Sequence, residues 1–239
     1  LQESLDIDID IENSAGEADS LNNLGIILME QGELEEAERA YRRSLTIKKK
    51  IGNRHGEADT LGNLGVIAWR LGDLEEAESL HRKSLKLRRE MGKQAEVAVS
   101  LNSLGIIARD RGDLEEAERL LRKALEIDRD VGNRKGEANS LSNLGIIASM
   151  GGDTEAAERL HREALSINRE LGHRNGELGT LHDLGALFEM IGDYPRAESH
   201  YRESVRICNE IGMKLSPWHI ENGYTEPDSE WNFPPQTIE

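Results

Sequence analysis

The residues that could do chemistry in this chain are few, and they form no catalytic or metal-binding pattern. The seven histidines are scattered, and the single cysteine, Cys208, has no basic neighbour in sequence that would activate a thiolate. There is no His-Glu-x-x-His, no cysteine pair and no phosphate-binding loop. Alternate aspartates from Asp6 to Asp10 resemble the start of a calcium loop, but Ile11 stands where that loop requires glycine. The sequence therefore predicts a protein that is not an enzyme and has no cofactor or metal ion.

Charge and composition exclude several classes of partner. The 239 residues have a formal net charge of −16, and only 4% of them are aromatic. Binding to phosphate groups needs clustered lysine and arginine, so we expect neither nucleic acid nor an anionic membrane as a partner. The chain has no apolar run near 18 residues and no signal-peptide pattern at its start. We therefore expect a cytoplasmic protein.

The elements that position these residues come from an internal repeat. A Leu-x-x-Leu-Gly motif returns every 40 residues, without insertion, at Leu21/Leu24/Gly25, Leu61/Leu64/Gly65, Leu101/Leu104/Gly105, Leu141/Leu144/Gly145 and Leu181/Leu184/Gly185. A fixed period of this length is typical of a stack of identical supersecondary units. Such a stack offers an extended binding face more readily than a closed catalytic pocket.

Each copy contains the signals for two helices. In the copy spanning 137–176, apolar residues recur at helical spacing from Glu137 to Ser149 and again up to about Arg169. A glycine pair ends the first stretch, and Asp153 then stands at an N-cap position. In the sister copies a glutamate follows three residues after the aspartate, as in a capping box. The pattern predicts helix, tight turn, helix and a glycine-containing link.

A glycine in the middle of each first helix points to close packing. Such a glycine costs about 1 kcal/mol relative to alanine, so its return in every copy needs a compensating gain. We expect the partner helix to approach closely there, with an alanine of the second helix as the matching small residue. The glycines are Gly25, Gly65, Gly105, Gly145 and Gly185, and the alanines are Ala37, Ala77, Ala117, Ala157 and Ala197.

These positions, with small residues at Ser44, Ser84, Ala124, Ala164 and Ser204, resemble the tetratricopeptide repeat. The 40-residue period is similar to the variant of Partner-of-Inscuteable-type adaptors, rapsyn and kinesin light chains. The chain departs from that family in having leucine for the usual aromatic at the fourth position and a glycine link for the closing proline. The resemblance implies an all-α fold, a right-handed solenoid of antiparallel helix pairs with five full repeats and a leading half repeat.

The repeat register suggests three regions. We expect residues 1–14 to be the second helix of a preceding unit, 15–212 to form five repeats, and 213–239 to be a tail rich in proline and aromatic residues. The tail is expected to cap the array or to occupy its groove. Self-association through the solenoid ends or the tail is a further expectation.

The resemblance also implies a ligand-binding face. In such families the first helices line a concave groove, and asparagine at the sixth position pairs with the backbone of a bound peptide, which here applies to Asn23, Asn63 and Asn143. We expect the groove to contain Asn22, Asn23, Asn63, Asn102, Asn143, His182, Asp183, Met29, Trp69, Arg70, Arg109 and Glu189. No lysine or arginine stands at the positions that bind a chaperone carboxylate. The arginines of the links, Arg54, Arg134 and Arg174, are expected to pair with Glu57, Glu137 and Glu177 or with acidic groups of a ligand.

The predicted function is therefore a non-enzymatic scaffold that binds a peptide or helical segment of another protein. Two alternatives remain. One is a sensor or regulatory arm of a larger signalling or transcriptional regulator, and the other is a self-assembling structural module.

Overall fold

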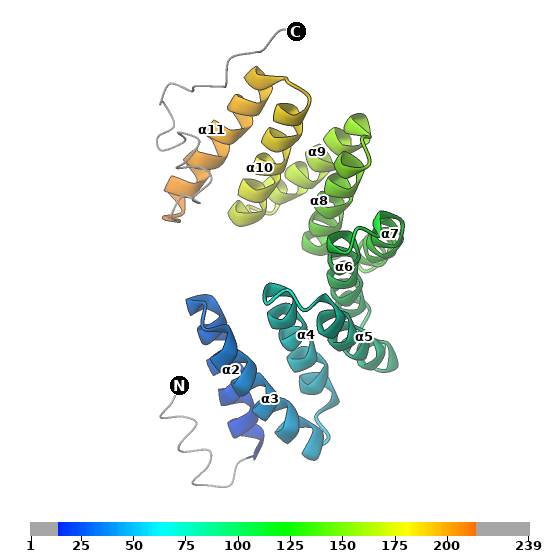
Figure 1. Ribbon diagram of the computed structural model, residues 1–239, viewed down its shortest axis with the longest axis vertical. Coiled ribbons are helices and arrows are strands. Elements are labelled where there is room, and N and C mark those ends of the chain that lie inside the picture. The colour runs from blue at the N-terminus through cyan, green and yellow to red at the C-terminus, as the bar shows by residue number, and fades with distance from the viewer. Residues whose placement is uncertain (1–13, 214–239) are drawn as a thin grey trace. The chain divides into compact units, whose positions relative to one another are not determined.

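The computed structural model describes residues 14–213, which form ten α-helices and no strand (Figure 1). The helices are α2 Ser14–Gln31, α3 Leu34–Lys50, α4 Arg54–Arg70, α5 Leu74–Glu90, α6 Gln94–Asp110, α7 Leu114–Asp130, α8 Arg134–Met150, α9 Thr154–Glu170, α10 Arg174–Met190 and α11 Tyr194–Glu210. The predicted half repeat and the predicted tail lie outside the described residues, apart from Ser14 and Met213. No helix within 14–213 is long and apolar enough to span a bilayer.

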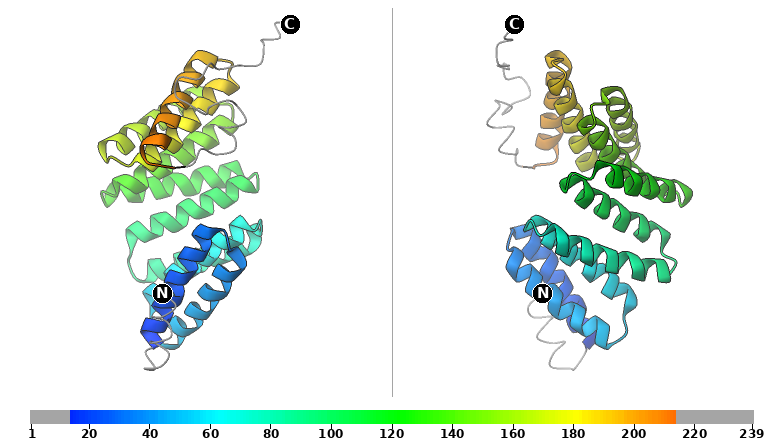
Figure 2. Two further views of the ribbon diagram at one scale, coloured as in Figure 1. Left: turned by 90° about the vertical axis from the view of Figure 1, so that its left-hand side faces the viewer. Right: turned by 45° about the vertical axis from the view of Figure 1, so that its right-hand side comes forward.

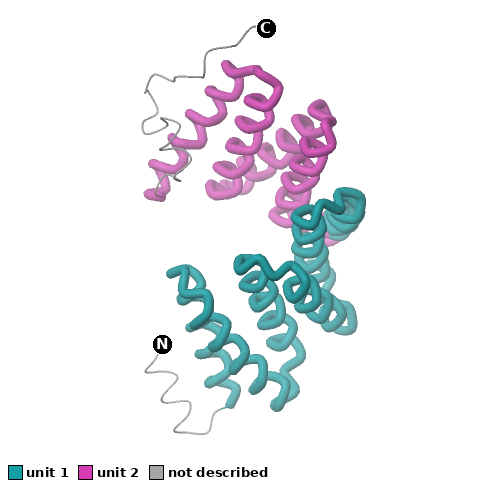
Figure 3. The backbone as a smooth tube through the Cα atoms, viewed as in Figure 1, with its two compact units in different colours: residues 1–127 teal, residues 128–239 magenta. Residues whose placement is uncertain are grey.

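The helices pack in consecutive pairs. The leading helices α2, α4, α8 and α10 pack against the helix that follows each of them, and α3, α5 and α9 pack in turn against the next leading helix. Figure 2 shows the two helices of each pair running alongside one another. The chain divides into two compact units, 1–127 and 128–239 (Figure 3). This succession of helix pairs within each unit is the predicted α-solenoid fold.

Glycine and aspartate build the turn inside each pair. Gly72 has φ of 82°, a left-handed conformation that favours glycine, and the following Asp73 N–H bonds to Ala68 O at 2.9 Å. The Asp73 carboxylate then accepts a hydrogen bond from Glu76 N at 2.9 Å, which confirms the predicted N-cap. In a capping box, the Glu76 side chain would in turn accept a hydrogen bond from the Asp73 N–H. That N–H is already bonded to Ala68 O, so this second bond has no donor. The turn thus ends one helix and starts the next.

The link between pairs is shorter than the sequence pattern indicated. Helix α8 begins at Arg134, three residues before the predicted Glu137. The Asn133 side chain accepts from Gly136 N at 3.2 Å and so caps the helix one residue before Arg134. Gly132 supplies the left-handed turn with φ of 69°. The link is therefore a helix end and a helix start, not a separate connection.

The glycines of the leading helices do mark a close approach, but the partner predicted for them was wrong. A Cβ atom added to Gly65 would lie 2.6 Å from His81 Nε2, and one added to Gly105 would lie 2.7 Å from Leu121 Cγ. Each glycine makes room for a large buried side chain four residues beyond the predicted alanine. These side chains are Tyr41, His81, Leu121, His161 and Tyr201. The alanines are fully buried, but the atoms nearest to each glycine belong to these large side chains.

Polar side chains are buried where one repeat meets the next. A residue near the end of the second helix contacts the serine or threonine that immediately precedes the Leu-x-x-Leu-Gly motif of the next leading helix. The pairs are Lys48 with Thr60 at 3.3 Å, Arg88 with Ser100 at 2.9 Å, Asp128 with Ser140 at 3.4 Å and Asn168 with Thr180 at 3.2 Å. All eight residues are buried. Burying polar groups is tolerated when they are hydrogen-bonded, so each junction carries its own polar pair.

Candidate functional site

Successive leading helices lie side by side within each unit, as shown by side-chain contacts about one repeat apart. In unit 1, Thr60 Oγ1 lies 3.3 Å from Asn22 Oδ1, which joins α4 to α2. In unit 2, the Ser142 and Thr180 hydroxyls are 3.3 Å apart and join α8 to α10. The faces that carry the predicted ligand-binding residues are therefore neighbours along the repeat.

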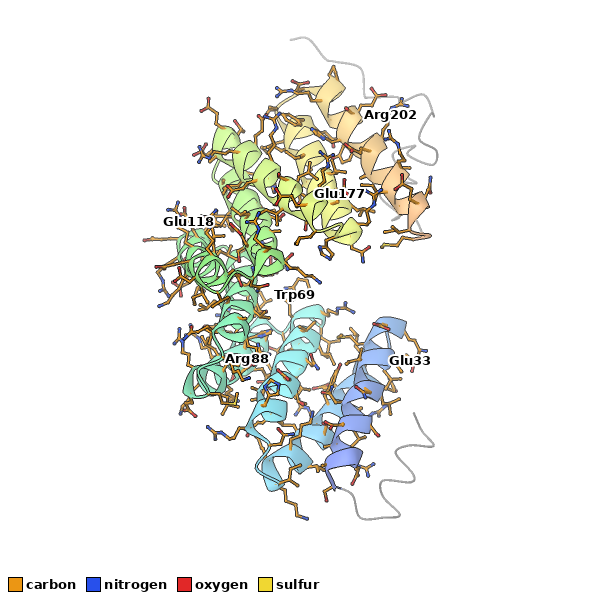
Figure 4. The ribbon with its side chains drawn as sticks, turned by 180° about the vertical axis from the view of Figure 1, so that it is seen from behind. Glu33, Trp69, Arg88, Glu118, Glu177 and Arg202 are labelled. Atoms are coloured by element: carbon orange, nitrogen blue, oxygen red, sulfur yellow. The ribbon has the colours of Figure 1, made fainter. Side chains whose placement is uncertain are left out.

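Trp69 lies beside a small cavity on this face. The residue is 37% exposed, and its Nε1 donates a hydrogen bond of 2.6 Å to Asp110 Oδ2 on α6. The ring lines a small, largely apolar cavity of about 130 Å³ together with Val66, Ile106 and the buried His81. Figure 4 labels Trp69. A cavity of this size and lining suits one apolar side chain of a partner.

The asparagines do not form a uniform ladder. Asn23 is exposed, whereas Asn63 and Asn143 are half-buried. Asn102 and Asn143 already take part in an interaction within the protein. Asn22 has Thr60 within reach, as described above. The part of the set most available to a ligand is thus the pair Asn23 and Asn63.

The predicted residues at the C-terminal end are tied to one buried tyrosine. Tyr201 donates a hydrogen bond of 2.9 Å to Glu189, and the His182 ring meets the Tyr201 ring edge-on at 5.4 Å between centroids. Burial and the Glu189 carboxylate raise the pKa of Tyr201, and burial lowers the pKa of His182. Asp183 lies 4.0 Å from His161 Nδ1. These contacts help to hold α10 on α9 and α11.

The remaining predicted residues also have partners inside the protein. Met29 packs against the core of unit 1, and its carbonyl accepts a bond of 3.3 Å from Arg70 Nη1. Arg109 pairs with Asp110 at 2.7 Å, so Asp110 receives both a guanidinium and an indole. Arg109 is therefore neutralised by Asp110, and Arg70 is held by a backbone carbonyl.

The chemically reactive side chains are in unreactive environments. The Cys208 thiol is buried, lies 3.2 Å from the Met213 carbonyl, and has its pKa raised by burial, which disfavours the thiolate. Burial lowers the pKa of His81 and of His161 to about 4, with Arg88 adding to the effect at His81. Both rings are thus neutral near pH 7, and both Nδ1 atoms lack a hydrogen-bond partner among the described residues.

One group of metal-ligand types occurs among the described residues. Ligand atoms of His55, Asp59 and Glu96 lie within 4.8 Å of one another. The Arg88 guanidinium already lies in this group, 2.9 Å from Asp59 Oδ1 and 3.9 Å from Glu96 Oε2. Because a fixed cation neutralises both carboxylates, this group is best described as an ion-pair cluster.

The arginines that begin the leading helices form ion pairs within the chain. Arg134 and Arg174 pair with Glu137 and Glu177, as predicted, and both glutamates are buried. The partner expected for Arg54 was wrong, because Arg54 pairs with Glu90 at the end of α5, the second helix of the same pair. Its exposed guanidinium contacts the partner helix α5 instead of a residue of its own helix.

Comparisons with known proteins agree with this architecture. Family models described as tetratricopeptide repeat match residues 2–90, 96–170 and 178–211. No curated protein gives a significant sequence match. Among solved structures, BtubC (BKLC) from P. vanneervenii has a TM-score of 0.72 and 22% identity, covering 90% of this chain and 91% of that one.

Two further structures are similar. A Rap protein complexed with Competence and Sporulation Factor has a TM-score of 0.76 and 17% identity, covering 86% of this chain and 58% of that one. Nearly identical TPR-like repeats of a Podosopora anserina putative kinesin light chain have a TM-score of 0.62 and 16% identity, covering 81% and 95%. These likenesses concern the fold, and the family models cover most of the sequence. The chain belongs to the tetratricopeptide repeat family.

Proposed function

We propose that this protein is a non-enzymatic interaction scaffold that binds a peptide or helical segment of another protein along its leading helices. The observation that carries the proposal is the Trp69 cavity on the same face as the exposed Asn23 and the half-buried Asn63. An apolar pocket for one side chain and amide groups for a peptide backbone are the two elements that such binding requires.

The free energy that binding requires explains why the cavity matters. Three asparagine hydrogen bonds contribute about 0.5–1.5 kcal/mol each, whereas micromolar binding requires about 8 kcal/mol. Burying one apolar side chain adds about 1.5–3 kcal/mol. The half-buried apolar side chains that follow the asparagines, Ile26 and Val66, would supply further contact area. We therefore expect a ligand that presents at least one large apolar residue to Trp69.

The similar Rap structure supports peptide or protein binding as the function of this fold, because that protein is complexed with a factor. It also supports the second candidate, a sensor or regulatory arm. The likeness covers most of this chain but only 58% of the Rap chain, so a comparable array occurs there as part of a larger protein. A ligand selected on this chain would be the starting point for testing either role.

The test is selection of ligands from a random peptide library, followed by affinity measurements on three variants. We expect Trp69→Ala to weaken a selected peptide at least tenfold, since about 1.4 kcal/mol corresponds to a factor of ten. Asn63→Ala should weaken it several-fold. Asn209→Ala, at an exposed position in the last turn of α11, is the control and should change nothing. Unchanged affinity in both Trp69→Ala and Asn63→Ala would exclude this face as the binding site.

Self-assembly is the remaining alternative. Multi-angle light scattering over a hundredfold range of protein concentration tests it directly. A constant monomer mass would exclude the structural-module interpretation and leave the binding proposal unaffected.

A further inference from the structure

The second helices of the pairs in unit 1, α3, α5 and α7, which we call the outer helices, carry exposed cations. Lys49 on α3, Lys83 and Arg89 on α5, and Lys123 on α7 are all exposed, and none has an ion pair among the described residues. We call these four residues the cationic strip. Positive charge without local compensation is unexpected in a chain whose net charge is −16.

The repeat register shows how unusual the strip is. In unit 2, Arg129 Nη2 pairs with Glu163 at 2.6 Å, and Arg169 Nη2 pairs with Glu203 at 2.7 Å, each across 34 residues. The same spacing in unit 1 relates Lys49 to Lys83 and Arg89 to Lys123. Equivalent positions therefore hold ion pairs in unit 2 and like charges in unit 1.

One arginine of unit 1, Arg89, also lacks the second acidic partner that its equivalents have in unit 2. Arg129 and Arg169 each take another glutamate of the next leading helix, at 2.7 Å from Glu137 and 3.0 Å from Glu177. The residue that corresponds to these glutamates after Arg89 is Val97. Arg89 thus lacks both of the carboxylates that neutralise the equivalent arginines in unit 2, because Val97 and Lys123 stand in their places. Neighbouring like charges are unfavourable in the free protein, and an anionic partner would relieve that repulsion.

We propose that the cationic strip is a second docking surface, on the outer helices, that binds a short carboxylate-rich protein segment. In α3 and α5 the positive charge lies in the second half of the helix, whereas the second half of α7 carries Glu126 and Asp130 as well as Lys123. The first turns of the same helices are acidic, at Glu35 and Glu36, Glu75 and Glu76, and Glu115 and Glu116. A short acidic segment fits within the strip and avoids those turns.

The same distribution disfavours nucleic acid. Screening limits electrostatic interactions to about 8–10 Å at moderate salt, so a short segment interacts mainly with the strip. A long phosphate backbone would extend over the acidic first turns, and the net charge of −16 repels polyanions. Charge complementarity thus selects a short acidic peptide.

The test uses a substitution for which unit 2 provides the precedent. Lys83→Glu combined with Lys123→Glu creates the arrangement already present at Glu163 and Glu203, so the double variant should fold with an unchanged or higher Tm. Fluorescence anisotropy with a fluorescein-labelled octaglutamate peptide measures binding. We expect the wild type to bind in a salt-dependent manner and the double variant to bind at least tenfold more weakly.

A matched control separates the strip from net charge. Lys135→Glu combined with Arg159→Glu makes the same charge change at exposed cations of unit 2 and should alter octaglutamate affinity by less than twofold. Trp69→Ala should also bind octaglutamate normally, so this result is independent of the leading-helix proposal. Three outcomes would overturn the inference: equal losses in both double variants, no binding by the wild type, or tighter binding of a single-stranded 20-nucleotide DNA than of the peptide.

Discussion

The indole Nε1 of Trp69 donates a hydrogen bond of 2.6 Å to the carboxylate of Asp110, which lies 41 residues later on the neighbouring leading helix. This bond holds the exposed aromatic ring of Trp69, labelled in Figure 4, which lines an apolar cavity. A ring that is already held loses little conformational freedom when a ligand binds. The bond also couples two repeats, because Trp69 lies on α4 and Asp110 on α6.

Asp110→Ala should therefore release the indole. In a background where Trp218 and Trp231 are changed to phenylalanine, Trp69 is the only tryptophan of the chain. We expect acrylamide to quench its fluorescence more strongly after Asp110→Ala. Stability to urea should fall by only about 0.5–1.5 kcal/mol, since the bond is partly solvent-exposed. Asp130→Ala, at an exposed position on α7, should alter neither quantity.

Two glycines of α4 should respond in opposite directions to the same substitution. Gly65→Ala places a Cβ 2.6 Å from His81 Nε2 inside the helix interface, and overpacking of this kind costs about 1–3 kcal/mol. At Gly62 a Cβ would meet its nearest atoms at 3.8 Å, an ordinary contact. Gly62→Ala should thus stabilise by up to about 1 kcal/mol through helix propensity. Equal effects of the two substitutions in urea unfolding would contradict the proposed packing role of Gly65.

The two buried histidines should make stability depend on pH. Burial lowers the pKa of His81 and His161 from 6.5 to about 4, so the unfolded chain binds protons first as the pH falls. Stability is thus greatest above pH 6.5 and is lost progressively as the pH falls towards 4. Each histidine should account for about 1 kcal/mol between pH 7.5 and 5.5, a window above most carboxylate titration.

The check is urea unfolding at both pH values for the wild type and for His81→Leu with His161→Leu. Leucine occurs naturally at the equivalent position, Leu121. We expect the double variant to lose most of the pH dependence in this window. A slope as steep as that of the wild type would show that other groups are responsible.

The fold followed from the sequence because its signals repeat. A 40-residue period, the turn glycines and the N-cap aspartates each recur, so an error at one copy is corrected by the others. The partner of the mid-helix glycine was missed because Tyr41, His81 and Leu121 differ in chemistry while sharing one size requirement. Periodicity gives the face of a helix, but it does not tell which large side chain fills the space over a glycine.

The candidate site was less accessible to sequence reasoning for a related reason. Position in the repeat places Asn63 and Glu189 on the same face, but it does not show that Glu189 accepts a bond from the buried Tyr201. The polar pairs at the junctions were missed because Lys48, Arg88 and Asp128 vary in charge from copy to copy. The regular serine or threonine opposite them was the signal that could have revealed these pairs.

The junction at Arg88 offers a test of how these buried polar pairs work. Arg88 bonds to Ser100 and lies beside Asp59 and Glu96, and the Glu96 Oε2 atom is buried without a hydrogen bond of its own. Arg88→Asn removes the cation and leaves Glu96 uncompensated, at a cost of about 1–3 kcal/mol.

The equivalent junction in unit 2 shows how to repair that loss. There Asn168 replaces the arginine and faces Gly176, where an added Cβ would lie only 2.4 Å from Asn168 Oδ1. Arg88→Asn combined with Glu96→Gly should therefore recover at least half of the lost stability in urea unfolding, even though glycine costs up to about 1 kcal/mol in a helix. Glu96→Gly alone should destabilise, because Arg88 then loses a carboxylate. If the two losses simply add in the double variant, the residues at these positions act independently and the junctions are not interchangeable polar pairs.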